Sequence, residues 1–184
     1  TRSHVKLNRP NGMSVKEVFM FNSFKGFTLL ELMVTLVIVA IFAAIAIPSY
    51  QYFIVKAHKA QAQTEMLKIS ERLENYRSKQ LSYAGYIPDN ENIGAKGIVN
   101  IPYGSISTAY DYQISLVDIN DTTKSLEESA LGQGWTLVAV PNQVKNNTLR
   151  KSESLLLNSQ GLKCKTADVL TKASINCGVN SKDW

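Results

Sequence analysis

Residues 27–47 decide the fold: they read FTLLELMVTLVIVAIFAAIAI, and only Thr28, Glu31 and Thr35 interrupt the apolar run. At about 1.5 Å per residue, a helix of this length spans roughly 30 Å, the thickness of a bilayer's hydrocarbon core. Within lipid only a helix can satisfy its own backbone groups in a single segment. The stretch therefore predicts a transmembrane helix over residues 27–48.

The charge of the chain is unevenly distributed. The net charge is +5, and residues 1–26 contribute +4 of it, from five basic side chains and one acidic one. Basic residues ahead of an apolar segment place its amino end in the cytoplasm, so the rest of the chain is expected to be exported. The remaining 158 residues carry 15 basic and 14 acidic side chains. Bulk charge therefore gives little support to a nucleic-acid-binding function for them.

The order of the leader and the apolar run is unusual for an exported protein. A secretory signal loses its apolar region when it is cleaved. Here the expected cut, in Lys25-Gly26-Phe27, comes before the apolar run, so that the mature protein keeps its helix. We therefore predict a leader peptide over residues 1–26. The sequence begins with Thr1, and Met13 and Met20 are both candidate translation starts.

After Pro48 the pattern changes to that of an amphipathic helix. Spacings of three, four and seven residues connect the apolar positions, which form one helical stripe. We predict one helix over about residues 27–79, bent near Pro48, whose second half packs on a globular head. His58 and Glu65 are expected on its solvated side. The stripe consists of Val55, Ala62, Met66, Ile69, Leu73 and Tyr76.

The rest of residues 49–184 predicts a β-sheet head. Residues 81–109 are rich in turn formers and predict a long loop with at most one short element. Strands are expected at 110–117, 134–140, 154–157 and about 162–165. Alternation in the first of them, with Tyr112, Ile114 and Leu116 apolar, indicates a sheet with one covered face.

The segment Lys25-Gly26-Phe27-Thr28-Leu29-Leu30-Glu31, followed by the apolar run, resembles the amino-terminal motif of type IV pilins and pseudopilins. In that family a prepilin peptidase cuts after the glycine and methylates the new amino terminus. The resemblance implies cleavage between Gly26 and Phe27, with Phe27 as the N-methylated residue. An extended glycine and a neighbouring cation suit a cut at the cytoplasmic membrane surface.

Glu31 is a carboxylate in an otherwise apolar helix, where it costs a few kcal/mol unless it has a partner or a purpose. The first helical turn offers one explanation, because the helix dipole favours a negative charge there. The family resemblance implies another, an ion pair with the amino-terminal cation of a neighbouring subunit during assembly. The two explanations are compatible.

Cys164 and Cys177 are the two cysteines of the chain, with 12 residues between them. Because the head is expected in an oxidising compartment, a disulfide is favoured over free thiols. The region offers no second pair of cysteine or histidine ligands for zinc. Many type IV pilins have a carboxyl-terminal disulfide loop, and this pair resembles it.

The head is similar to PilE-type minor pilins in three short patterns: residues 82–85, 134–141 and 155–161. The resemblance implies the α+β type IV pilin fold, a long bent amino-terminal helix packed on an antiparallel sheet. We expect no catalytic residue, cofactor or metal site. His58 is expected to be an isolated surface residue, and the sequence contains no phosphate loop or nucleophile motif.

The sequence therefore predicts a structural, minor pilin of a type IV pilus, used for adhesion, twitching motility or DNA uptake. Its expected partners are other pilin subunits, prepilin peptidase, the inner-membrane assembly platform and, before assembly, lipid. Two alternatives remain, a pseudopilin of a type II secretion system and a DNA-binding pilin of a competence pilus. The second needs a basic face, for which the candidates are Lys145, Arg150, Lys151, Lys163, Lys165 and Lys172. A solvated surface is the preferred interpretation of these six.

Overall fold

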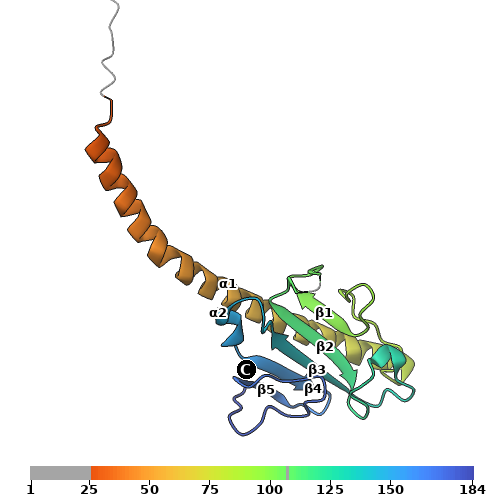
Figure 1. The fold of residues 1–184 in the computed structure, drawn as a ribbon. Coiled ribbons are helices and arrows are strands. Elements are labelled where there is room, and N and C mark those ends of the chain that lie inside the picture. Colours follow the sequence, from red (N-terminus) through yellow and green to blue (C-terminus); the bar gives the residue numbers. More distant parts are fainter. Residues whose placement is uncertain (1–25, 107) are drawn as a thin grey trace, which may run out of the picture. The chain divides into compact units, whose positions relative to one another are not determined.

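The computed structural model describes residues 26–106 and 108–184 (Figure 1). Except for Gly26, the predicted leader and both candidate start methionines lie outside these residues. A single helix, α1, runs over Leu29–Gln80 and confirms the predicted long helix. The chain divides into two compact units after Ile41, within α1. The bend expected near Pro48 stays a prediction.

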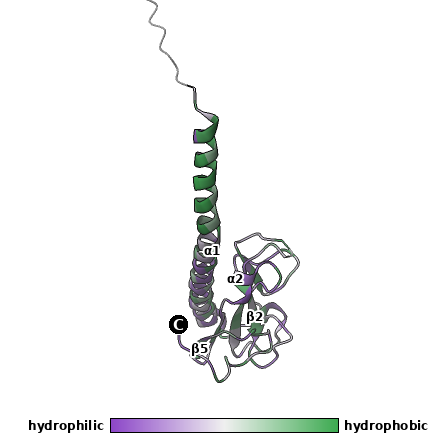
Figure 2. Ribbon diagram, turned by 60° about the vertical axis from the view of Figure 1, so that its left-hand side comes forward, coloured by the Kyte–Doolittle hydropathy of each residue, from purple (hydrophilic) through white to green (hydrophobic). Residues whose placement is uncertain are grey.

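The first part of α1 is apolar on all sides. Its large side chains are exposed around the whole circumference, for example Leu30 at 73% and Val39 at 63%. Figure 2 shows the change from a hydrophobic first part to a hydrophilic second part. Among the described residues, α1 is the one helix long and apolar enough to cross a membrane. A monomer in water cannot cover such a surface, so lipid or other subunits must do so.

The head contains an antiparallel sheet of five strands in sequence order, β1 to β5. Four strands match the predicted ones within two residues. The fifth, β1, is the one short element that the prediction for residues 81–109 allowed, and it pairs with β2 through Ile98↔Ser115 and Ile101↔Tyr112. The bounds are β1 Ile98–Ile101, β2 Tyr112–Asp118, β3 Trp135–Pro141, β4 Ser154–Asn158 and β5 Lys163–Thr166.

The core lies between the second part of α1, from Val55 to Gln80, and one face of the sheet. The predicted helical stripe is buried there, from Val55 through Leu73, with Tyr76 packed at its edge. Alternation in β2 to β4 supplies the facing side chains, because successive residues of a strand point to opposite faces. These are Ile114, Leu116, Leu137, Ala139, Leu155 and Leu157.

The other face of the sheet is also partly covered, so the expectation of one covered face was incomplete. A second apolar cluster contains Val138, Leu156, Leu170 and both cysteines. The segment after β5 therefore lies on this face. Two short helical elements complete the head: a 3-10 turn at Leu126–Glu128 and α2 at Asn147–Arg150.

Two close backbone approaches fix the loops around the sheet. Gly132 has φ +51°, and a Cβ there would lie 2.0 Å from the backbone nitrogen of Ala84. Its carbonyl accepts a hydrogen bond from the Tyr83 amide at 2.9 Å. At Gly97, with φ +68°, a Cβ would lie 2.4 Å from the Leu116 carbonyl oxygen. Only glycine fits at these positions.

Candidate functional site

The start of α1 contains the residues predicted to direct processing and assembly. Thr28 precedes the helix, and its hydroxyl accepts a hydrogen bond from the Glu31 amide at 3.1 Å. Threonine at the cap with glutamate three residues later is a capping-box sequence. Glu31 is thus in the first turn, where the amide dipoles favour its negative charge.

Gly26 and Phe27 lie just before this cap. Phe27 is 77% exposed, and a Cβ on Gly26 would meet no atom within 4 Å. The fold therefore does not require glycine at position 26. Within the apolar part of the helix, the Thr35 hydroxyl donates to the Leu32 carbonyl at 2.9 Å. This internal bond satisfies a polar group that lipid could not.

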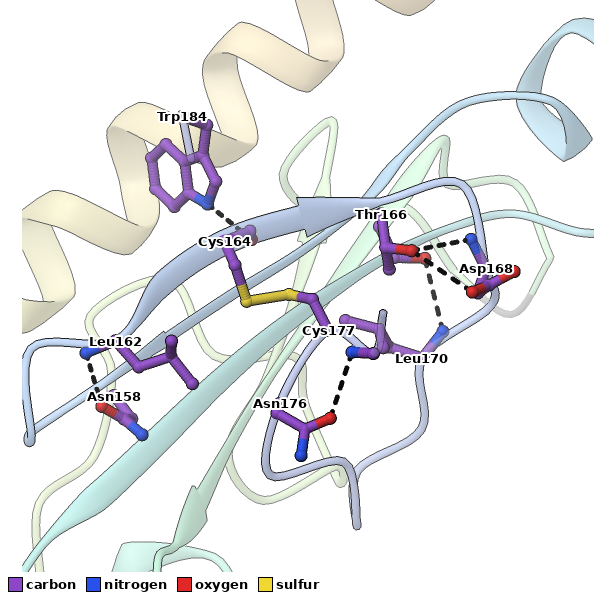
Figure 3. The surroundings of a disulfide bond; sticks show 11 residues. Asn158, Leu162, Cys164, Thr166, Asp168, Leu170, Asn176, Cys177 and Trp184 are labelled. Carbon is purple, nitrogen blue, oxygen red and sulfur yellow. Dashed lines mark hydrogen bonds between the residues drawn. A yellow bond between two sulfur atoms is a disulfide. The ribbon is translucent and has the colours of Figure 1, made fainter. Parts of the chain in front are cut away.

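Cys164 and Cys177 form the predicted disulfide, with Cα atoms 6.1 Å apart (Figure 3). Both cysteines are buried in the second apolar cluster, where Leu170 from the loop between them also packs. The Trp184 indole donates to the Cys164 carbonyl at 2.8 Å. The disulfide therefore attaches the loop after β5 to that strand, and the Trp184 hydrogen bond attaches the carboxyl-terminal tail to it.

The sequence predicted His58 on the solvated side of α1, but its side chain faces the head and is only 23% exposed. Its Nδ1 is 2.5 Å from Oδ2 of Asp111, whose side chain is 6% exposed, while the Lys145 ammonium contacts the other carboxylate oxygen at 2.5 Å. Position 58 is three residues after Val55, on the stripe side of the helix. Apolar periodicity alone missed it because the residue is polar.

Glu65 was also expected in solvent, but it is 1% exposed. Its carboxylate accepts hydrogen bonds from the Asn90 side-chain amide at 3.1 Å and the Tyr103 hydroxyl at 2.6 Å. Burial, followed by the hydrogen bond to Glu65, raises the pKa of Tyr103 to about 12. Glu65 thus attaches the long loop to α1.

Four of the six basic residues considered for a DNA-binding face lie in different surroundings. Lys145 is paired with Asp111. Lys163 and Lys165 are on β5, and the Lys163 ammonium lies 4.5 Å from the centre of the Trp184 ring. Lys172 borders a hollow with Val138 and Val140, on the other side of the sheet from α1.

Potential metal ligands are scattered. Over residues 26–106 and 108–184, no three histidine, cysteine, aspartate or glutamate side chains are grouped so that they could hold an ion. Asp111 and Glu65 instead use their oxygens to connect α1 with the head. The site of interest is therefore the start of α1 and the surface of the head.

Comparison with known families gives two matches that together cover most of the described chain. The family described as "Type IV minor pilin ComP, DNA uptake sequence receptor" matches residues 48–155, more than half of the chain. The "Prokaryotic N-terminal methylation motif" matches residues 21–47, which include Gly26, Phe27 and Glu31.

The chain belongs to the type IV minor pilin family.

Individual relatives are also type IV fimbrial proteins, although two of those named here are major pilins. The type IV major fimbrial protein FimA of Dichelobacter nodosus is 31% identical over 116 residues, covering 60% of this chain and 68% of FimA. A fimbrial protein of Moraxella nonliquefaciens is 51% identical over 43 residues, 23% of this chain and 28% of the relative. The type IV major alpha-pilin of Moraxella bovis is 47% identical over 45 residues, 24% and 28% of the two chains. No solved structure matches this pilin closely.

Proposed function

We propose that this pilin is a minor structural subunit of a type IV pilus, held in the inner membrane before assembly and then incorporated into the filament. The observation that carries the proposal is the start of α1, an uncovered apolar helix whose first turn contains one carboxylate, Glu31. In this account the leader, residues 1–26, is cytoplasmic, residues 27–48 cross the membrane, and residues 49–184 form the exported part.

Cleavage between Gly26 and Phe27 by prepilin peptidase, with methylation of Phe27, is the first step of this proposal. The match to the methylation motif supports it. The exposed position of Phe27 and the empty space around Gly26 are compatible with access of a peptidase to this bond. Extraction by an inner-membrane assembly platform would follow.

Glu31 has a specific task in assembly. Moving an apolar helix from lipid to a filament gains little from the hydrophobic effect, because lipid tails are as apolar as the helix. Polar contacts therefore decide how neighbouring helices align. An uncompensated carboxylate in this medium costs a few kcal/mol, and the methylated amino terminus of a neighbouring subunit would remove that cost. We assign Glu31 to this contact.

Two substitutions separate processing from assembly. Glu31→Ala should be cleaved normally but should be nearly absent from sheared pili, while Glu71→Ala, at an exposed position of the same helix, should be incorporated normally. Gly26→Ala should remain uncleaved although it disturbs no contact in the fold. Immunoblots of membrane and sheared fractions measure both steps. Normal incorporation of Glu31→Ala would refute the role assigned to Glu31.

The pseudopilin of a type II secretion system remains the nearest rival. The pilin family match and the carboxyl-terminal disulfide favour the pilus. Deleting the gene distinguishes them, because loss of piliation or twitching with normal protein secretion supports a pilus, whereas the converse result supports the secretion system.

A second candidate function is binding of DNA during uptake, which the printed description of the matching family favours. The part of the head that this match covers ends at Leu155 and includes Arg150 and Lys151, both exposed. Affinity for duplex fragments of the organism's own genome and for scrambled duplexes should be measured against salt. A steep salt dependence reports phosphate contacts, and a preference for the genomic duplexes reports recognition. Equal, weak binding of both would exclude the receptor function.

A further inference from the structure

A groove of about 620 Å³ lies between α1 on one side and α2 with the segment that joins it to β4 on the other. Its volume is in the range of small-ligand sites. It belongs entirely to the unit that starts at Phe42. The lining residues on the helix are Tyr52, Val55, Lys56 and Lys59, and those on the head are Asn147, Thr148, Lys151, Ser152 and Glu153.

The groove has an excess of positive charge. Lys59 forms an ion pair with Glu153, which neutralises both. Lys56 and Lys151 are exposed, and within the described part of the chain neither lies within ion-pair distance of a carboxylate. The hydroxyl groups of Tyr52 and Thr148 add hydrogen-bond donors. Two free ammonium groups beside hydroxyl donors suit a phosphate.

The surroundings of Glu153 add to this charge. The pKa of Glu153 is held below its usual range, first by the hydrogen bond from Lys59 and further by the charges of Lys165 and Lys182. Lys165 on β5 and Lys182 near the carboxyl end form a backbone bridge, with hydrogen bonds of 2.7 and 2.9 Å, and neither lysine lines the groove itself. Their charges act on Glu153, one of the residues that line the groove.

The helical side of the groove follows closely after the end of the apolar run. Along a helix, Tyr52 is about 7.5 Å beyond Ile47, where the apolar run ends, and so lies within a headgroup layer roughly 5–8 Å thick; the Lys56 backbone, about 13.5 Å beyond Ile47, lies past that layer. Tyr50, Tyr52 and Phe53 are exposed, at 68%, 59% and 63%. Exposed aromatic rings just past a membrane span are typical of the interface. Helical side chains lean toward the amino end, which brings the Lys56 ammonium back toward the headgroups.

We propose that this groove binds the phosphate of an anionic phospholipid of the periplasmic leaflet while the subunit waits in the membrane. Lys56 and Lys151 supply the charge, and the hydroxyl groups of Tyr52 and Thr148 donate to the phosphate oxygens. The inference rests on the membrane-held stage proposed above. Its consequence is that extraction into the filament must break this lipid contact, so anionic lipid retains the subunit until assembly begins.

The test uses the full chain in phosphatidylcholine nanodiscs that contain increasing amounts of phosphatidylglycerol. Native mass spectrometry then counts the lipids that remain bound after the disc is removed. The groove variant is Lys56→Gln/Lys151→Gln, and the matched control is Lys68→Gln/Lys79→Gln, which removes two exposed lysines of α1 outside the groove. Circular dichroism of both variants confirms that they fold.

The wild type and the control should retain phosphatidylglycerol selectively, and the groove variant should bind it about 10- to 30-fold more weakly. Equal retention by the groove variant and the control would overturn the proposal. So would tighter binding of inorganic phosphate or of a short DNA duplex through the same two lysines. Protein that does not co-elute with the discs would contradict the membrane-held stage itself.

Discussion

Opening the disulfide between Cys164 and Cys177 should destabilise the head by an amount that can be worked out from the structure. The bond closes a loop of about 14 residues, for which the chain-entropy relation gives about 3 kcal/mol. Replacing both cysteines by alanine also removes two buried sulfur atoms, each worth roughly 1 kcal/mol of apolar burial. The exposed fractions of Cys164 and Cys177 are 4% and 2%, so this packing loss is nearly complete.

The assay is thermal and urea unfolding of the full chain in detergent, followed by circular dichroism. Reduced wild type should lose about 3 kcal/mol, or roughly 10 °C of Tm, and Cys164→Ala/Cys177→Ala about 4–5 kcal/mol. The variant should not respond to reductant, which is the control. A loss below about 1 kcal/mol in the reduced wild type would refute the argument that the disulfide holds this loop on the face of the sheet opposite α1.

Three further predictions concern contacts between α1 and the head. Asp111→Asn should cost about 2–3 kcal/mol in urea unfolding, because it leaves the Lys145 ammonium and the His58 imidazole beside a neutral amide; an unchanged midpoint would contradict the contact. Gly132→Ala should cost at least about 2 kcal/mol by the same assay, since the new methyl group would collide with the Ala84 backbone. The pKa of Glu153 is lowered in the folded state, so its stabilisation is present above its ordinary pKa of 4.5 and is lost as pH falls below it. Lys59→Gln should therefore flatten the acid limb of the pH–stability curve, and an unchanged limb would exclude this ion pair as its cause.

The long helix and β2 follow from periodicity in the sequence, and the sequence also predicted β3, β4 and β5 within two residues. Val55, Ala62, Met66 and the rest of the stripe repeat at helical spacing, and they are buried as expected. β2 was recognisable because Tyr112, Ile114 and Leu116 alternate with polar residues, which is the pattern of a strand against a core. Local pattern suffices where each element carries its own apolar face.

The parts that the sequence could not place depend on partners far along the chain. β1 has four residues among turn formers, too few to show a period, and its place in the sheet depends on its pairing with β2. Glu65 and His58 are polar residues on the buried side of α1, and Asn90, Tyr103 and Asp111 stabilise them there. Their burial is a tertiary effect that periodicity of apolar residues does not register.

The residues of the candidate site also differ in whether the sequence alone could identify them. Gly26, Phe27 and Glu31 were assigned from a compact motif, and the match to a methylation motif over residues 21–47 agrees with that motif. Their roles stay predictions. The groove beside Lys56 and Lys151 could not have been found from sequence, because these two lysines are 95 positions apart and meet only in the folded head.

The most direct test of the central claim is the intact mass of this subunit recovered from sheared pili. The account predicts a chain that starts at Phe27, carries one added methyl group on its amino terminus, and is lighter by two hydrogens for the disulfide. A chain that retains residues before Phe27, or one cut after the apolar run, would contradict it. So would complete absence of the subunit from the sheared fraction when the pili themselves are present.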